Sequence, residues 1–253
     1  MKNIPDWIAD YRKRIEENNK LFGEDIERIL VSSDTSRKFT PSGEARAFHG
    51  FSLVFFVEPE SELMNKLSDT KNTFHSLLQR SGIGSAFAFL PTNTYHITLV
   101  GIATNQSEKI QQEIVRGVHD CFNTFRTHKI HPPKIVVRGD LSLDGSTIIA
   151  PIEPEDIESL DTIYYIRDEV RKRLHPLGKN IVRNTPHNFH GHISLAYIVK
   201  NLAGEDYKKL KKIIQIHSTS KPIGKTVITS VSFSRFETIV DWGAPLSTFS
   251  LID

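Results

Sequence analysis

The sequence lacks the features that would indicate membrane insertion or redox chemistry. Its 253 residues contain a single cysteine, Cys121, which excludes an internal disulfide and a cysteine-rich zinc module. No stretch reaches the roughly 18 consecutive apolar residues that a membrane-spanning helix needs. The first twenty residues carry acids and bases throughout and have no apolar core like that of a signal peptide. We therefore expect a cytoplasmic protein without a membrane partner.

A large excess of charge of either sign is also absent. Lys and Arg number 32 against 30 Asp and Glu, and charged residues make up 25% of the chain. This balance excludes a polycation that coats nucleic acid, and it does not indicate disorder. Any preference for phosphate must therefore come from a local site.

Hydrophobic periodicity predicts alternating strands and helices, hence an α+β or mixed fold without a glycine-rich phosphate loop. Helical spacing occurs at 60–80, 106–127, 154–178 and about 204–216. Strands are predicted at 51–59, 94–102, 190–200, 225–240 and 245–252, with a hairpin turn at Asp144-Gly145. Residues 1–36 are predicted to be an N-terminal helical extension, followed by a polar segment with turns, and residues 37–253 the main domain.

Two of the predicted strands carry polar residues inside apolar runs: "TYHITLVGI" at 94–102 and "GHISLAYIV" at 191–199. Because side chains alternate along a strand, His96 and Thr98 share one face, as do His192 and Ser194. The same alternation predicts that Tyr95 and Tyr197 point to the opposite face and pack in the core. A third match to His-x-Ser/Thr, residues 217–219, lies at a predicted helix end and not in an apolar strand.

Two such strands side by side would direct two imidazoles and two hydroxyls into one cleft. One neutral imidazole can then take a proton from a nucleophile while the other, as imidazolium, protonates the leaving oxygen of a phosphodiester. The hydroxyls can donate to the non-bridging oxygens as negative charge builds there. This chemistry needs no metal and no cofactor, and the sequence does not decide which histidine is acid and which is base.

The pair "YHITLVG" and "HISLAYI" resembles the two signature strands of the two-histidine (2H) phosphoesterase superfamily, which includes RNA 2′,3′-cyclic phosphodiesterases, also called 2′-5′ RNA ligases. The flanks "KFTPSGEARAFHGFSLVFFV" and "FSRFETIVDWGAPL" resemble a bacterial branch known as a domain of unknown function. The resemblance covers about residues 37–250. It implies a bilobal α+β fold, with two antiparallel-sheet-plus-helix lobes in pseudo-twofold symmetry around a central cleft. It also implies metal-independent action on nucleotide or RNA phosphoesters, with a catalytic set of His96, Thr98, His192 and Ser194.

Three further residues are candidates for substrate binding. Arg235 alternates with apolar neighbours in a late strand, from which a guanidinium can bind phosphate with two hydrogen bonds. Arg46 and Phe48 come just before the first strand, where they would contact phosphate and stack on a base, respectively. Each of the three also has a purely structural interpretation, as an ion-paired or packed residue.

Two alternatives stay open beside the expected hydrolysis of a 2′,3′-cyclic phosphate or a related nucleotide or RNA-end phosphodiester. A nucleotide- or RNA-binding module without turnover would keep the cleft but would not need two proton-transfer groups. A metal-dependent hydrolase built on His187, His190 and His192 would need further ligands, and no known metal-site spacing is completed around them.

Overall fold

The computed structural model describes residues 8–9, 12–13, 28–104, 106–128, 130–178, 180–182, 189–219 and 221–252. Apart from residues 8, 9, 12 and 13, which are helical, the helices expected in the first 27 residues lie outside these ranges. His187 lies outside them as well. Within the described ranges, every helix is too short or too polar to cross a bilayer.

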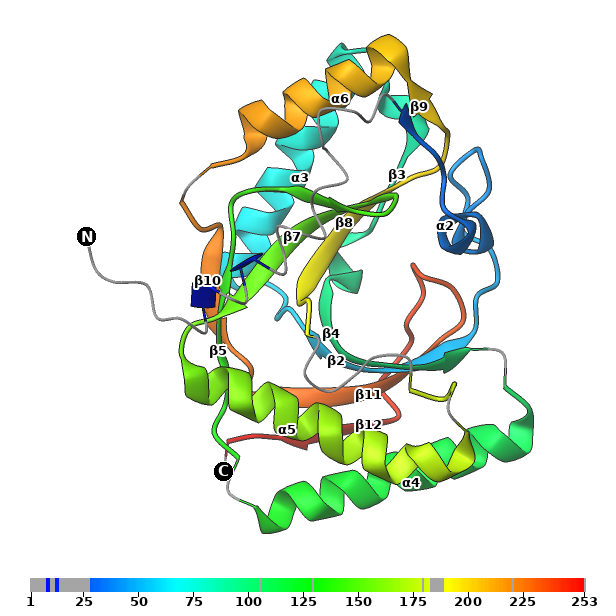
Figure 1. The fold of residues 1–253 in the computed structure, drawn as a ribbon, viewed down its shortest axis with the longest axis vertical. Coiled ribbons are helices and arrows are strands. Elements are labelled where there is room, and N and C mark those ends of the chain that lie inside the picture. The colour runs from blue at the N-terminus through cyan, green and yellow to red at the C-terminus, as the bar shows by residue number, and fades with distance from the viewer. Residues whose placement is uncertain are drawn as a thin grey trace.

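A curved antiparallel sheet forms the centre of the described structure (Figure 1). Its strands follow in the order β10 (Gly224–Val227), β5 (Lys134–Val137), β7 (Thr147–Pro154), β8 (His192–Ile198), β4 (His96–Thr104), β2 (Gly50–Phe56), β11 (Ser230–Phe236) and β12 (Ser247–Ser250). Short strands β3 (Phe87–Phe89) and β6 (Ser142–Asp144) pair with β8 and β7, and β1 (Arg28–Ile29) pairs with β9 (Leu202–Ala203). The strands that contain the two His-x-Thr/Ser motifs, β4 and β8, are therefore neighbours in the middle of the sheet.

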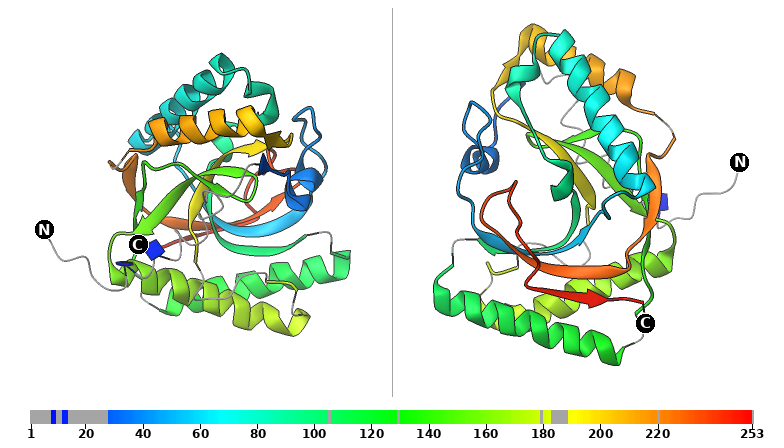
Figure 2. Two further views of the ribbon diagram at one scale, coloured as in Figure 1. Left: turned by 45° about the horizontal axis from the view of Figure 1, so that its top comes forward. Right: turned by 180° about the vertical axis from the view of Figure 1, so that it is seen from behind.

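Two pairs of helices cover the two arms of this sheet. The helices are α2 (Ser33–Lys38), α3 (Glu62–Arg80), α4 (Glu108–Thr127), α5 (Ile157–Leu174) and α6 (Gly204–His217). Helices α3 and α6 lie together over the arm with β7, β8 and β10, whereas α4 and α5 lie together against the arm with β2, β11 and β12 (Figures 1 and 2). The short helix α2 lies at the side of the molecule, between the two arms of the sheet (Figure 1).

The local sequence explains where the helices begin and which face they bury. Ser61 and Asp156 cap α3 and α5 by accepting hydrogen bonds from backbone N–H groups three residues later. Helix α4 buries Ile114, Val118 and Cys121, among others, at steps of three and four residues, so one stripe faces the core. The expected α+β fold is confirmed, with strands and helices near the predicted ranges.

Helix α2 begins at the end of the predicted helical extension and continues into the polar segment, where the sequence pattern predicted turns. Ser32 caps α2 by accepting a hydrogen bond from the Thr35 N–H at 3.1 Å. The hydroxyl of Thr35 is buried and lies 2.6 Å from the Ser146 hydroxyl in the turn between β6 and β7. These contacts place α2 against the body of the fold although only one of its residues is buried.

Strand β4 has a β-bulge directly after its motif. On the neighbouring strand β2, Leu53 pairs with Val100 and Val54 pairs with Thr98. Leu99 therefore has no partner on β2. It is the extra residue of the bulge, inserted in β4 between two residues whose partners are adjacent in β2. A bulge of this kind reverses the alternation of side chains for the residues that follow it.

Strand β8 has the same irregularity at the equivalent position. Ile148 of β7 pairs with Ala196 and Ile149 pairs with Ser194, which leaves Leu195 unpaired. The two bulged leucines are 96 residues apart, the same separation as the two histidines. Both motif strands therefore carry a histidine, a hydroxyl residue and a bulge in the same order.

Candidate active site

The two motifs meet where β4 and β8 run side by side. Ile97 and Ile193 are direct partners in the antiparallel ladder, and both are fully buried. Extending this register by one residue in each direction gives the facing pairs on the other side of the sheet: His96 with Ser194, and Thr98 with His192. Diagonal neighbours in such a ladder lie about 7–8 Å apart, which is the relation between the two histidines. Both imidazoles can therefore reach one small group placed between them.

All four motif residues line one cavity of about 190 Å³. Each of them is partly exposed, whereas Ile97, Leu99 and the corresponding residues of β8 are buried on the other face. The cavity wall also contains Asp34 and Lys38 of α2, the side chain of Tyr197, and an aromatic group formed by Phe48, Phe236 and Trp242. The site is thus a small pocket with polar groups on the strands and apolar groups around them.

Each histidine ring is oriented by the backbone of its own strand. The Nδ1 atom of His96 lies 2.7 Å from the carbonyl oxygen of Thr94, and that of His192 lies 3.1 Å from the carbonyl oxygen of His190. A carbonyl can only accept, so Nδ1 carries the proton in the neutral ring. The Nε2 atom of each neutral imidazole is then the acceptor, and within the described ranges no residue is hydrogen-bonded to it.

Aromatic side chains hold the ring of His96 on two sides. The centroid of the Trp242 ring lies 4.1 Å from that of the imidazole, and the centroid of the Phe56 ring lies 6.0 Å from it, with the two planes at 68°. The indole N–H of Trp242 donates to the carbonyl of Ile239 at 3.1 Å, which fixes the indole in turn. Contacts of this kind restrict the imidazole to one orientation and remove much of its water.

The environment lowers the pKa of both histidines. Burial lowers the pKa of His96 to about 4, and the charges of His192 and Lys38 act in the same direction, against the hydrogen bond to Thr94. Burial also lowers the pKa of His192, but there the Asp144 carboxylate and the His190 carbonyl act against it. Both rings are therefore neutral in the free protein at pH 7, and His192 has the more favourable surroundings for a proton.

The bulges change which residues share the cavity with the motifs. Tyr197 was expected on the opposite face, but its side chain lines the cavity because the bulge at Leu195 reverses the alternation. Gly101 takes the equivalent place in β4 and lines the cavity too. Tyr95, which precedes the bulge in its strand, is buried in the core as the alternation predicts.

The three predicted substrate-binding residues occupy different places. Phe48 lines the cavity, but it is buried and its ring stacks against Phe236, with centroids 5.8 Å apart. Arg235 is about half exposed on β11 and pairs with Glu237 at 2.9 Å, and Arg46 donates to the carbonyl of Phe39 at 3.1 Å. Neither arginine lines the cavity.

Lys38 and Asp34 also line the cavity, although the sequence pattern did not predict them as site residues. Both belong to α2, about sixty residues before the first motif, in a segment whose composition predicts turns. Charged residues in a polar segment carry no signal of burial, so only the packing of α2 against the body places them at the site. Lys38 is nonetheless the one Lys or Arg among the described residues that line the cavity.

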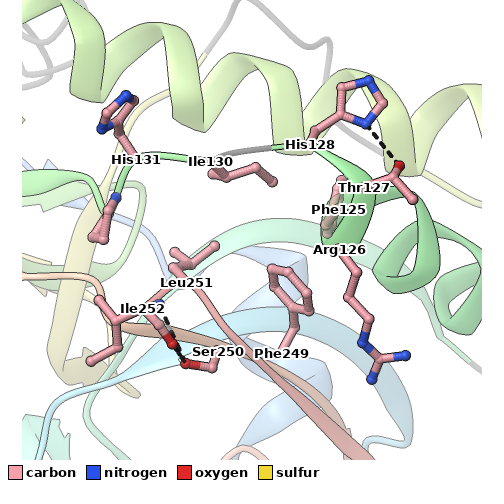
Figure 3. Close-up of a pocket in the computed structure, with 11 residues that line it drawn as sticks. Phe125, Arg126, Thr127, His128, Ile130, His131, Phe249, Ser250, Leu251 and Ile252 are labelled. Atoms are coloured by element: carbon pink, nitrogen blue, oxygen red, sulfur yellow. Dashed lines mark hydrogen bonds between the residues drawn. The ribbon is translucent and has the colours of Figure 1, made fainter.

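Two larger cavities lack the features of a catalytic site. One, of about 510 Å³, lies between the end of α4 and β12 and contains His128 and His131 (Figure 3). These rings lie apart in Figure 3, and each has another partner: His128 faces the carbonyl of Thr124, and His131 pairs with Glu158. Within the described part of the chain, no His-x-Thr/Ser strand contributes to this cavity.

The other, of about 600 Å³, is built around an ion cluster. Arg12 and Arg138 both bind the carboxylate of Glu153, which is buried, and Arg138 also pairs with Asp140. Among the described residues, no three or more His, Cys, Asp and Glu side chains are grouped so that they could hold a metal ion. His217, from the third motif match, is the last residue of α6; its ring packs against Phe74, and it does not line the cavity of the two motifs.

The fold and the site together define an α+β protein with a curved antiparallel sheet and paired His-x-Thr/Ser strands. Residues 38–112 match the family model described as 2H-phosphodiest, domain of unknown function (DUF1868). The matched range contains the first motif, His96 and Thr98, and the match agrees with the resemblance that the motifs indicated. No curated protein matches the chain.

Solved structures share the fold at low sequence identity. The conserved protein of unknown function ATU0111 from Agrobacterium tumefaciens str. C58 has a TM-score of 0.64 at 15% identity, covering 93% of this chain and 99% of that chain. TT0787 of Thermus thermophilus has a TM-score of 0.52 at 16% identity, covering 80% and 97%. E. coli LigT complexed with 3′-AMP is more distant, with a TM-score of 0.46 at 12% identity, covering 81% and 99%. The first two likenesses establish the fold alone.

Proposed function

We propose that this protein is a metal-independent phosphoesterase that hydrolyses a 2′,3′-cyclic phosphate or a related phosphodiester of a nucleotide or RNA end. One observation carries the proposal: two matched His-x-Thr/Ser strands meet in one cavity, with the proton-accepting nitrogen of each imidazole free. A binding module has no need of two proton-transfer groups in matched positions. The proposed catalytic residues are His96, Thr98, His192 and Ser194.

We assign the base role to His96 and the acid role to His192. The pKa of His96 is lowered to about 4, so this ring is neutral over most of the pH range and can accept a proton. The negative charge of Asp144 favours the protonated form of His192. It therefore offsets part of the decrease that burial causes in the pKa of His192. A bound phosphate anion would stabilise an imidazolium further, so a single proton in the site belongs on His192.

The reaction then balances with one water and no other reactant. His96 Nε2 takes a proton from the water as its oxygen forms a bond to phosphorus, and the bond from phosphorus to one ribose oxygen breaks. His192 gives its proton to that leaving oxygen, which becomes a hydroxyl. Thr98 and Ser194 each face the histidine of the other strand, so their hydroxyls can donate to the two non-bridging oxygens.

We also propose that the two arms of the sheet are lobes related by a pseudo-twofold axis between β4 and β8, within a domain of residues 37–253 that follows an extension of residues 1–36. Three strands of the main path lie on either side of this central pair. The equivalent bulges at Leu99 and Leu195 support the same relation.

Turnover of adenosine 2′,3′-cyclic phosphate in the presence of EDTA tests the function. We expect product from the wild type, and a loss of at least about a hundredfold in His96→Ala and His192→Ala with an unchanged melting temperature. Full activity in both variants would refute the mechanism. Tight binding without product would favour a nucleotide-binding module, and loss of activity on chelation would favour a metal-dependent hydrolase.

A second substrate separates the two histidines. A nucleoside 3′-(p-nitrophenyl phosphate) has a leaving group that departs without protonation, so a general acid contributes little to its cleavage. We expect His192→Ala to recover much of its activity on this substrate, whereas His96→Ala stays impaired. Recovery by His96→Ala alone would reverse the assignment.

A further inference from the structure

Lys38 brings a positive charge into a cavity that otherwise holds mainly neutral groups. Its ammonium lies at the C-terminal end of α2, only 14% of its side chain is exposed, and Asp34 Oδ2 lies 2.5 Å from Nζ. The same nitrogen lies 5.1 Å from the ring centroid of Tyr197 and 5.4 Å from that of Phe48. An ammonium held among aromatic rings keeps few waters, so an anion that replaces them gains a strong contact.

The charge of Lys38 acts on both catalytic imidazoles. Beside the larger effect of burial, it lowers the pKa of His96 and also that of His192, so the ammonium lies within electrostatic range of each ring. Burial lowers the pKa of the lysine itself, but Tyr197 and Asp34 outweigh it and raise that pKa, so the side chain stays protonated. Lys38 is therefore a permanent cation that faces the place where the proposed mechanism puts the phosphate.

The net formal charge of the residues around the cavity is zero or +1, depending on the protonation of the histidines. With both histidines neutral, the Lys38 ammonium and the Asp34 carboxylate cancel. With the one imidazolium that the mechanism requires, on His192, the site carries a single positive charge. A cyclic phosphate or other phosphodiester carries one negative charge, whereas a phosphate monoester carries nearly two above its second pKa of about 6.

We propose, on the basis of the function proposed above, that Lys38 binds the non-bridging oxygens of the substrate and that Asp34 limits the site to a singly charged phosphodiester. The substrate then matches the charge of the site. Hydrolysis turns it into a doubly charged monoester, which the Asp34 carboxylate repels. The same pair of residues thereby selects the substrate and favours release of the product.

Substitution of Lys38 tests the binding role. For adenosine 2′,3′-cyclic phosphate, we expect Lys38→Met to raise KM about tenfold or more, because a charge-assisted hydrogen bond is lost. Lys38→Arg should keep part of the affinity. Both should leave the melting temperature close to that of the wild type.

The pH optimum of kcat/KM should also move upward in Lys38→Met, since the charge that lowers the pKa of both histidines is gone. Lys209→Met, in an exposed ion pair with Asp206 on α6, is the matched control and should change neither value.

Substitution of Asp34 tests the charge selection. We expect Asp34→Asn to strengthen inhibition by adenosine 3′-monophosphate about tenfold at pH 8, where this monoester is doubly charged, because a nearby negative charge has been removed. An unchanged inhibition constant would refute the selection by charge. An unchanged KM and pH optimum in Lys38→Met would refute the role of Lys38.

Calorimetry separates failure of this inference from failure of the proposed function. If the wild type binds adenosine 2′,3′-cyclic phosphate without turnover, the proposed hydrolysis is wrong, and binding by Lys38→Met then decides the present inference. Weaker binding by this variant supports the role of Lys38, and equal binding refutes it. If the wild type does turn the substrate over, the kinetic constants above decide.

Discussion

At the scale of the residue, the chemistry depends on two imidazoles kept neutral in a partly buried cavity. The four motif residues follow from the sequence because a polar residue at every second position of an apolar strand marks one face. Lys38 does not follow from it, because its burial depends on a six-residue helix held by contacts far along the chain. The face to which a strand residue points can be predicted from its neighbours in the sequence. The packing of a polar segment against the rest of the fold cannot be predicted in this way.

The lowered pKa of His96 makes stability depend on pH. Because the folded-state pKa of about 4 lies below the ordinary value of 6.5, the unfolded chain binds a proton in this window that the folded chain does not. The free energy of unfolding should therefore fall as the pH drops from 6.5 to 4, by roughly 2–3 kcal/mol from this residue. Urea unfolding at pH 7 and pH 4.5 measures the change.

The variant His96→Phe should lose most of that dependence, because phenylalanine has no proton to bind and fits beside Trp242 and Phe56. His192 should still contribute a change of the same sign. His119, exposed on α4, is the control, and His119→Gln should behave like the wild type. A full wild-type dependence in His96→Phe would show that the pKa of His96 is not lowered.

Gly101 leaves space in the cavity where its counterpart Tyr197 supplies a ring. A Cβ atom at this position would meet no other atom within 4 Å, and the backbone does not require glycine. We expect Gly101→Leu to fill part of the cavity and lower kcat/KM at least about tenfold without lowering the melting temperature. Gly101→Ala should have a smaller effect. Unchanged kinetics in the leucine variant would place the substrate elsewhere.

At the scale of the element, the bulges in β4 and β8 decide which side chains surround the motifs. In a regular strand, the alternation of side chains would place Tyr197 on the face opposite His192. The bulge at Leu195 reverses this alternation, so Tyr197 lies on the same face as His192. Nothing in the sequence "HISLAYI" marks that leucine, because the bulge is stabilised by groups from other elements. The carbonyl of Leu195 accepts from the N–H of Leu90, and that of Leu99 accepts from the guanidinium of Arg167.

Arg167 should therefore be essential to the bulge in β4. Its side chain on α5 is buried, with the guanidinium 5.3 Å from the ring centroid of Phe189. We expect Arg167→Met to lower the free energy of unfolding by about 1–3 kcal/mol, since the Leu99 carbonyl loses its donor. Urea unfolding measures the loss, and Arg116→Met on the exposed face of α4 is the control. An equal stability of the two variants would mean that the bulge does not need the arginine.

At the scale of the whole molecule, the sequence predicts the order of elements better than their arrangement. The paired motifs imply that two distant strands meet, but the pairing of α3 with α6 and of α4 with α5 follows from how the sheet curves. One continuous sheet joins the two arms through β4 and β8. The core is correspondingly a single cluster of buried side chains.

This continuity predicts that both arms unfold together. In a Trp7→Phe background, the fluorescence of Trp242 reports on the cleft, while circular dichroism at 222 nm reports on the helices of both arms. We expect the two thermal transitions to coincide, as they do for a cooperative unit. Two separate midpoints would show that the arms are independently stable.

The backbone carbonyls of Thr94 and His190 fix the tautomer of the two histidines, with the proton on Nδ1 and the lone pair on Nε2. In a serine protease, an aspartate side chain holds the histidine in its working tautomer, so one point mutation removes that support. Here the main chain provides the same support, and the main chain is present whatever the neighbouring residues are. The tautomer of each imidazole therefore does not depend on any neighbouring side chain, and substitutions in the pocket wall can change the ligand while Nε2 remains the proton acceptor.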